Sequence, residues 1–174
     1  MPAIKIKDPI IINNVFDLDY FNNLLTDINK FTNAEKFFDV TSKRYITSGN
    51  EISIFKDAGE ILLPIANKIF NKNNLVSYDQ ICNHYEGEQT KLQRHKDVVP
   101  NIYVIDVCMY QKTPWDIIIE NKPYSLKIND AVCFYPGNQM HWREKFPDPK
   151  NNIVGMIQFY FAEEGHWILR DKIK

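Results

Sequence analysis

The chain has 174 residues and a formal net charge of −1, with 44% apolar and 25% charged residues. This length and composition fit an ordinary globular domain that buries one sizeable core. The nearly balanced charge gives no electrostatic case for nucleic acid or an anionic membrane as an obligatory partner. No apolar stretch approaches the roughly 18 residues that a membrane-spanning helix needs.

The N-terminus and the cysteines both favour an intracellular, cytoplasmic protein. The first eight residues lack the apolar core of a secretory signal. The three cysteines, Cys82, Cys108 and Cys133, show no Cys-x-x-Cys spacing. Their odd number predicts reduced thiols, most simply buried in strands.

The first part of the chain has the spacing of helices. Residues 9–15 predict a short apolar strand, and Asp17 can then cap a helix over residues 18–31, in which apolar side chains recur every three or four positions. A second helix is expected over about residues 60–71. Pro64 lies inside its apolar pattern, so this helix is expected to begin or to kink there.

The segment between the two expected helices has the composition of a loop. Residues 41–50 are rich in Thr, Ser, Lys and Gly, and no apolar periodicity runs through them. Lys43 and Arg44 within this segment are expected to be solvated charges.

From Leu75 on, the pattern changes to short apolar segments that are separated by turn residues such as Asn129-Asp130 and Pro136-Gly137. Eight strands are expected, over residues 76–85, 91–95, 103–110, 116–120, 124–128, 131–135, 141–145 and 153–161.

Eight short strands at near-even spacing, preceded by helices, predict a mainly β fold of the α+β class. The favoured architecture is a double-stranded β-helix, or jelly roll, with helices packed outside one sheet. A parallel α/β sheet is disfavoured because no helix-length segment separates the later strands. Residues 1–174 are expected to form a single domain, in which residues 1–74 give helical support and residues 75–162 form the eight-stranded core.

Three residues in the strand-rich part have the chemistry of a metal site. His95 and Asp97 stand two positions apart, at the end of the second expected strand and in the loop after it. His141 opens the seventh strand, after a Pro-Gly turn. In an eight-stranded roll the second and seventh strands can be neighbours, which brings the three side chains together. Two histidines and one carboxylate can occupy one face of an iron octahedron and leave the other positions open.

A His-x-acid pair alone is weak evidence, because a chain with four histidines and 22 acidic residues can contain one by chance. The alternative is three unrelated polar residues on the surface. Their order on a strand-rich background favours the metal site, so His95, Asp97 and His141 are the predicted iron ligands.

The second half of the chain, about residues 75–162, resembles the iron(II)- and 2-oxoglutarate-dependent oxygenase superfamily. The resemblance rests on the order of several short motifs, none of which is specific alone. They are Asn-His-Tyr-Glu-Gly at 83–87, His-Lys-Asp at 95–97, the apolar strand at 103–110, Leu-Lys-Ile-Asn-Asp-Ala-Val-Cys-Phe-Tyr-Pro-Gly at 126–137, His-Trp-Arg-Glu at 141–144 and Met-Ile-Gln-Phe-Tyr-Phe at 156–161.

The resemblance implies a function. Such proteins bind 2-oxoglutarate and O2 at an Fe(II) ion, release succinate and CO2, and use the resulting oxidant on an unactivated C–H bond, which is usually hydroxylated. The resemblance therefore implies an oxidoreductase of the dioxygenase class, with Fe(II) and 2-oxoglutarate as cofactors.

The chain departs from this family at the residue that usually holds the far carboxylate of 2-oxoglutarate. Relatives usually carry Arg or Lys at the start of the last strand, where this chain has Ile153 and Val154. Arg143 is the favoured replacement, because it lies two positions after His141 and shares its strand face. Lys150 in the preceding loop is the alternative anchor. The structural alternative for Arg143 is a salt bridge with an acidic residue at the rim of the barrel.

Four further polar residues have a functional and a structural interpretation. Tyr85 lies where relatives often carry a group that touches the co-substrate, although a core tyrosine is the alternative. His84 is expected on the opposite strand face with a structural role. Asp106 interrupts an apolar strand and either faces solvent or contacts substrate from inside. His166 is expected on the surface rather than at the metal.

These observations favour an Fe(II)- and 2-oxoglutarate-dependent hydroxylase that acts on a small molecule or an exposed side chain. Substrate is expected to enter at a mouth covered by residues 41–50 and 98–101. Two alternatives remain open. One is a cupin-like iron dioxygenase without 2-oxoglutarate, which the missing basic residue favours, and the other is a non-catalytic jelly-roll binding protein.

Overall fold

The computed structural model describes residues 7–32, 37–40, 44–49, 52–88, 90–148 and 150–170, and for residues 29–32 and 37 it describes only the backbone. Within these ranges the chain forms two antiparallel sheets, the helices α1 (Leu18–Thr32) and α2 (Ser53–Phe70), and a short 3-10 helix η1 (Trp167–Leu169).

The larger sheet consists of strands from both parts of the chain. In spatial order they are β1 (Ile10–Ile12), β9 (Ala131–Phe134), β6 (Tyr103–Gln111), β11 (Ile153–Glu163), β4 (Leu75–Glu86), β3 (Arg44–Ser48) and β2 (Phe37–Asp39). The smaller sheet has the order β5 (Leu92–His95), β10 (His141–Arg143), β7 (Ile117–Ile119) and β8 (Lys122–Tyr124).

From β4 onward the chain passes back and forth between the two sheets. β4, β6, β9 and β11 belong to the larger sheet, whereas β5, β7, β8 and β10 belong to the smaller one. All the pairings are antiparallel. This alternation between two facing sheets is consistent with the expected jelly roll.

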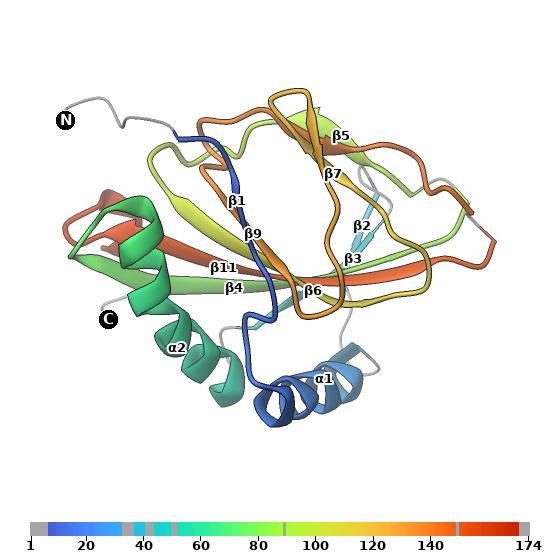
Figure 1. The fold of residues 1–174 in the computed structure, drawn as a ribbon, viewed down its shortest axis with the longest axis horizontal. Coiled ribbons are helices and arrows are strands. Elements are labelled where there is room, and N and C mark those ends of the chain that lie inside the picture. Colours follow the sequence, from blue (N-terminus) through green and yellow to red (C-terminus); the bar gives the residue numbers. More distant parts are fainter. Residues whose placement is uncertain are drawn as a thin grey trace.

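Two apolar layers hold the sheets and helices together. Figure 1 shows α1 and α2 on one side of the larger sheet and the strands β5 and β7 on the other. Phe159 of β11 faces the helices and packs with Leu62 of α2, whereas Val154 of the same strand lies between the sheets with Ile117 of β7. Residues an odd number apart on a strand point to opposite faces, so β11 supplies both layers.

The start of α1 agrees with the sequence, because Asp17 caps it through a hydrogen bond from the Tyr20 backbone N–H to Asp17 Oδ1 (2.8 Å). The start of α2 does not. This helix begins at Ser53 rather than near residue 60, and Pro64 lies in its interior. The apolar face of the helix already includes Phe55 and Ala58, which are buried against the larger sheet. Burying this longer face outweighs the backbone hydrogen bond that Pro64 cannot donate.

The expected loop at residues 41–50 is also wrong in its described part. Arg44–Ser48 is strand β3, which pairs with β4 in the register Arg44↔Tyr85 to Ser48↔Ile81. Residues 41–43 and 50 lie outside the described residues. The strand expected at 124–128 is also shifted, because β8 covers Lys122–Tyr124 and the chain turns at Glu120 and Asn121, both with positive φ.

The structure also shows the state of the cysteines and the character of the helices. The three cysteines are free and buried in β4, β6 and β9, as expected. Neither helix in the described part of the chain is long and apolar enough to cross a membrane.

Candidate metal centre

The three predicted ligands lie together at one end of the smaller sheet. β5 ends at His95, which pairs directly with His141 of β10, and the two ring centroids are 4.2 Å apart. Asp97 lies in the loop after β5, and Asp97 Oδ1 is 3.4 Å from His95 Nε2 and 3.6 Å from His141 Nε2. One possible ligand atom from each of the three residues lies within 4.8 Å of the others, so the group could hold a metal ion.

Backbone carbonyls orient both imidazoles for ligation. The Nδ1 atom of His95 is 2.7 Å from the Gln93 carbonyl, and that of His141 is 3.1 Å from the Gln139 carbonyl. A carbonyl only accepts, so each Nδ1 carries a proton, and Nε2 is the ring nitrogen that faces Asp97 and could bind a metal. The loop with Asp97 is held in the same way, because the Asp97 N–H donates to the Pro136 carbonyl (2.9 Å).

The protonation states also suit a metal. Burial lowers the pKa of His141 to about 4, so its imidazole is neutral at pH 7. Burial opposes the ionisation of Asp97, but the hydrogen bond with His95 and the charges of both imidazoles outweigh it and lower the pKa of the carboxyl below its ordinary value. The hydrogen bond with Asp97 raises the pKa of His95 above its ordinary value.

A chain of polar side chains leads from Asp97 into the space between the sheets. The Tyr160 hydroxyl is 3.4 Å from Asp97 Oδ2 and 3.1 Å from Gln158 Oε1, and Gln158 Oε1 also accepts a hydrogen bond from Asn83 Nδ2 (2.9 Å). Partners of this kind fix the orientation of a ligating carboxylate. Burial raises the pKa of Tyr160 well above its ordinary value, so this hydroxyl keeps its proton.

A cavity of about 340 Å³ opens directly beside the ligands. Its walls include His95 and Asp97 themselves, Tyr78 and Ile81 of β4, and Val99 of the loop after β5. This volume lies at the lower end of the range for small-molecule sites, and a mostly apolar wall with a few polar groups is typical of them.

Arg143 lies inside the fold, as expected from its spacing to His141. It is buried, its Nη1 atom donates to the Trp115 carbonyl, and its guanidinium stacks on the Trp115 ring (5.0 Å). Its Nη2 atom is 3.8 Å from Asp106 Oδ2, too long for a hydrogen bond. Arg143 Nη2 and Asp106 Oδ1 are both buried without a hydrogen-bond partner among the described residues. Such atoms normally meet a water or a ligand.

Asp106 faces the space between the sheets and not the solvent. This is the position from which it was expected to contact substrate. Burial raises the pKa of its carboxyl to about 7, although the guanidinium of Arg143 opposes the shift. Tyr85 is also buried on this interior side, in edge-to-face contact with Trp115.

Arg44 is the clearest error of the sequence interpretation. It is not a solvated charge, because only 17% of its side chain is exposed. Its Nη1 atom donates to the Tyr85 hydroxyl (3.0 Å), and its Nε atom is 3.4 Å from Asp39 Oδ2. A cation from outside the eight core strands therefore reaches the residue predicted to touch the co-substrate.

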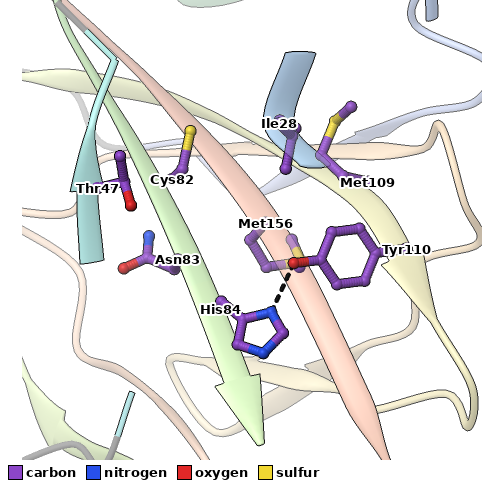
Figure 2. A pocket seen from close by; sticks show the side chains of 9 residues that line it. Ile28, Thr47, Cys82, Asn83, His84, Met109, Tyr110 and Met156 are labelled. Atoms are coloured by element: carbon purple, nitrogen blue, oxygen red, sulfur yellow. Dashed lines mark hydrogen bonds between the residues drawn. The ribbon is translucent and has the colours of Figure 1, made fainter. Parts of the chain in front are cut away.

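The other polar candidates lie away from the ligand cluster. Figure 2 shows His84 with a hydrogen bond to Tyr110 (Nδ1 to Oη, 2.6 Å), beside a cavity of only about 10 Å³. This volume holds at most about one water, so the structural interpretation of His84 stands. His166 is buried rather than exposed, because it caps η1 and contacts the Pro100 carbonyl. Lys150 is exposed in the turn before β11.

Gly137 sets the position of the loop that carries Asp97. A Cβ atom on Gly137 would lie 2.0 Å from the Val99 carbonyl oxygen, so an alanine there must displace backbone. We expect Gly137→Ala to lower the free energy of unfolding by about 1–3 kcal/mol and to weaken metal binding, measured by urea unfolding and Mn(II) titration. Gly87→Ala is the control: its φ of +93° costs about 1 kcal/mol but no atom lies near, so metal binding should not change.

The fold is similar to those of several solved structures. The non-haem α-ketoglutarate-dependent epimerase SnoN from nogalamycin biosynthesis has a TM-score of 0.75 at 7% identity, over 89% of this chain and 76% of that one. A Pseudomonas putida prolyl-4-hydroxylase has a TM-score of 0.68 at 11% identity, over 90% and 92%. The viral collagen prolyl hydroxylase vCPH from Paramecium bursaria Chlorella virus-1 has a TM-score of 0.62 at 11% identity, over 90% and 97%.

The chain has the fold of the iron(II)- and 2-oxoglutarate-dependent oxygenases. No family model and no curated protein matches its sequence. At identities of 7–12% the structural similarity shows the oxygenase fold and not a particular reaction.

The sequence predicted the three residues that lie together and could hold a metal, but not all of their surroundings. Gln158 and Tyr160 were assigned only to the aromatic end of a strand, yet both lie between the sheets. Their spacing of two on an otherwise apolar strand was the available signal. For Arg44 the available signal was the run Tyr45-Ile46-Thr47 after it, since aromatic and β-branched residues are enriched in strands.

Proposed function

We propose that this chain is an iron(II)- and 2-oxoglutarate-dependent dioxygenase that hydroxylates an unactivated C–H bond. The observation that supports this most strongly is the group of His95, Asp97 and His141, with both Nε2 atoms directed at Asp97, next to a cavity of about 340 Å³. Three protein ligands on one side of an octahedral ion leave three positions for a two-oxygen co-substrate and O2.

The donor set fits iron. The neutral imidazole of His141, the imidazole of His95 and the carboxylate of Asp97, whose pKa is lowered, make up the 2-His-1-carboxylate set that non-haem Fe(II) oxygenases use. The bound iron would supply O2 activation with electrons from 2-oxoglutarate. The chain itself holds the ion, orients Asp97 through Tyr160, and surrounds the open side with apolar walls.

Arg143 and Tyr85 are the proposed contacts of the co-substrate. Both lie in the interior between the sheets, and both contact Trp115. Arg143 retains a buried N–H group without a partner, which is what a carboxylate oxygen requires. Lys150, the alternative anchor, is exposed in its turn and would have to move to reach this space.

The cavity suggests the kind of prime substrate. Its volume suits a small molecule or a single side chain that enters beside Val98, whose side chain is 97% exposed at the rim. Residues 98–101 are therefore the proposed cover of the mouth, and Val98 and Val99 of this segment line the cavity. Residues 41–50 were the other segment predicted to cover the mouth. Of these, residues 44–48 form a strand of the larger sheet.

The decisive measurement is succinate formation from 2-oxoglutarate with Fe(II), ascorbate and air, without prime substrate. We expect slow turnover by the wild type and none by Asp97→Ala, because Asp97 is the one carboxylate among the ligands. Asp116→Ala, which removes an exposed carboxylate at the start of β7, should behave as wild type.

The other outcomes separate the alternatives. Oxygen consumption without succinate, in the presence of a candidate substrate, would favour a cupin-like iron dioxygenase. Metal binding with neither product would favour a binding protein. That residues 1–174 act as one domain and that the protein is cytoplasmic remain predictions from the sequence.

A further inference from the structure

One transverse row of the larger sheet carries an unusual set of residues. Strand β11 places Val154 directly opposite Tyr85 of β4, and β3 places Arg44 directly opposite Tyr85 on its other side. Residues directly opposite each other on neighbouring strands point to the same face. Arg44, Tyr85 and Val154 therefore form one row that faces the smaller sheet.

This row includes the position where relatives carry their basic residue. Val154 is buried in the layer between the sheets, so the start of β11 offers no cation there. A cation is present two strands away, because Arg44 extends over the Tyr85 ring with its Cζ 5.9 Å from the ring centroid. In this chain the cation of the row lies on β3 and not on β11.

Arg44 and Tyr85 leave donors for an anion. The Tyr85 hydroxyl accepts from Arg44 Nη1, so the Tyr85 proton remains to be donated, and no described residue accepts it. The guanidinium of Arg44 has five N–H groups. One on Nη1 donates to Tyr85, and the one on Nε is directed at Asp39. Its hydrogen bond to Tyr85, which is buried between the sheets, directs the Arg44 side chain toward the interior.

We propose that Arg44 and Tyr85 form a carboxylate subsite that binds the distal carboxylate of a 2-oxo dicarboxylic acid. The proposal rests on the proposed function and refines it. Arg44 and Arg143 approach the interior from different sheets, and Asp106 lies in the field of both. Arg143 keeps one buried N–H group without a partner, and Arg44 adds a second cation from the other sheet, so the interior favours a ligand with two carboxylates.

The test compares two probes on the Mn(II)-loaded protein by isothermal titration. 2-Oxoglutarate has a distal carboxylate, and 2-oxobutanoate lacks it but has the same 2-oxo acid group. We expect Arg44→Ala to weaken 2-oxoglutarate binding about ten- to a hundredfold and to leave 2-oxobutanoate binding unchanged. Arg44→Lys should recover only part of the loss, because a lysine lacks the guanidinium fork.

Two further variants keep the test informative. Arg94→Ala removes an exposed arginine that stacks on Trp142, and it should bind both probes as wild type does. Tyr85→Phe keeps the ring packing and removes only the hydroxyl, so it tests the subsite if Arg44→Ala fails to fold. We expect it to weaken 2-oxoglutarate binding about tenfold, with no change for 2-oxobutanoate.

The outcomes are distinct. Unchanged 2-oxoglutarate binding in Arg44→Ala and Tyr85→Phe, with a loss in Arg143→Ala, would overturn this subsite and leave Arg143 as the anchor of the proposed oxygenase. An equal loss for both probes would overturn it as well, because the effect would not depend on the distal carboxylate. Failure of the wild type to bind either probe would overturn the proposed function itself.

Discussion

Replacing His141 with alanine is expected to weaken Mn(II) or Fe(II) binding by more than about a hundredfold, because groups that only support a ligand already cost ten- to a hundredfold when removed. His141 is buried and its Nε2 atom lies 3.6 Å from Asp97 Oδ1, so the variant removes one of the three grouped ligand atoms. Titration calorimetry with Mn(II) measures the affinity directly.

The same variant should lose the thermal stabilisation that metal gives. A ligand that binds only the folded state stabilises it by about 2.7 kcal/mol at a hundred times its Kd. Wild-type protein should therefore melt at a higher temperature with excess Mn(II), and His141→Ala should not. His166→Ala is the matched control, since it removes the cap of η1 but no ligand. Equal metal affinity in His141→Ala and wild type would eliminate the predicted site.

Metal-free protein is expected to lose stability as the pH rises from about 4 to 7, because Asp106 stays protonated in the folded state over a range in which it ionises in the unfolded chain. Burial raises the folded-state pKa of this carboxyl to about 7, against about 3.9 in an unfolded chain. Between these values the folded state binds more protons than the unfolded state, so the free energy of unfolding falls with rising pH. A difference of about three pKa units corresponds to at most about 4 kcal/mol.

The variant Asp106→Asn isolates this contribution from other groups that titrate in the same range. Asparagine resembles the protonated carboxyl in shape and cannot ionise, so the variant should show a smaller loss of stability between pH 5 and pH 8 than wild type. Urea unfolding in the presence of a chelator, at several pH values, gives both curves. Parallel curves for the two proteins would show that Asp106 does not titrate in this range.

The strand-rich half and the ligands could be predicted because their determinants are local. Alternating apolar residues and turn residues mark each strand from β4 to β11, and the resulting order places β5 beside β10. Since His95 ends one of these strands and His141 opens the other, their meeting follows from strand order alone. Asp97 follows His95 by two residues, and this short spacing is enough to bring it to the same site.

Elements whose determinants lie elsewhere in the chain were not predictable. Pro64 suggests a helix start, yet α2 begins at Ser53, because Phe55 and Ala58 are buried against the larger sheet. Arg44 lies beside only three strand-forming residues, Tyr45 to Thr47, within a polar stretch, and its place in a strand depends on the backbone groups of β4 that pair with it. Pairing with Tyr85, 41 positions later, then buries its side chain in the interior.

The class of fold and the three residues that could hold a metal therefore follow from local patterns along the chain. Which charges lie inside depends on how the sheets pack: Arg44, Asp106 and Arg143 come from three strands of two sheets. Composition and spacing report how a residue relates to its neighbours in sequence. The burial and charge of a side chain depend on strands that pair with it from far along the chain, and this long-range pairing forms the interior in which a co-substrate would bind.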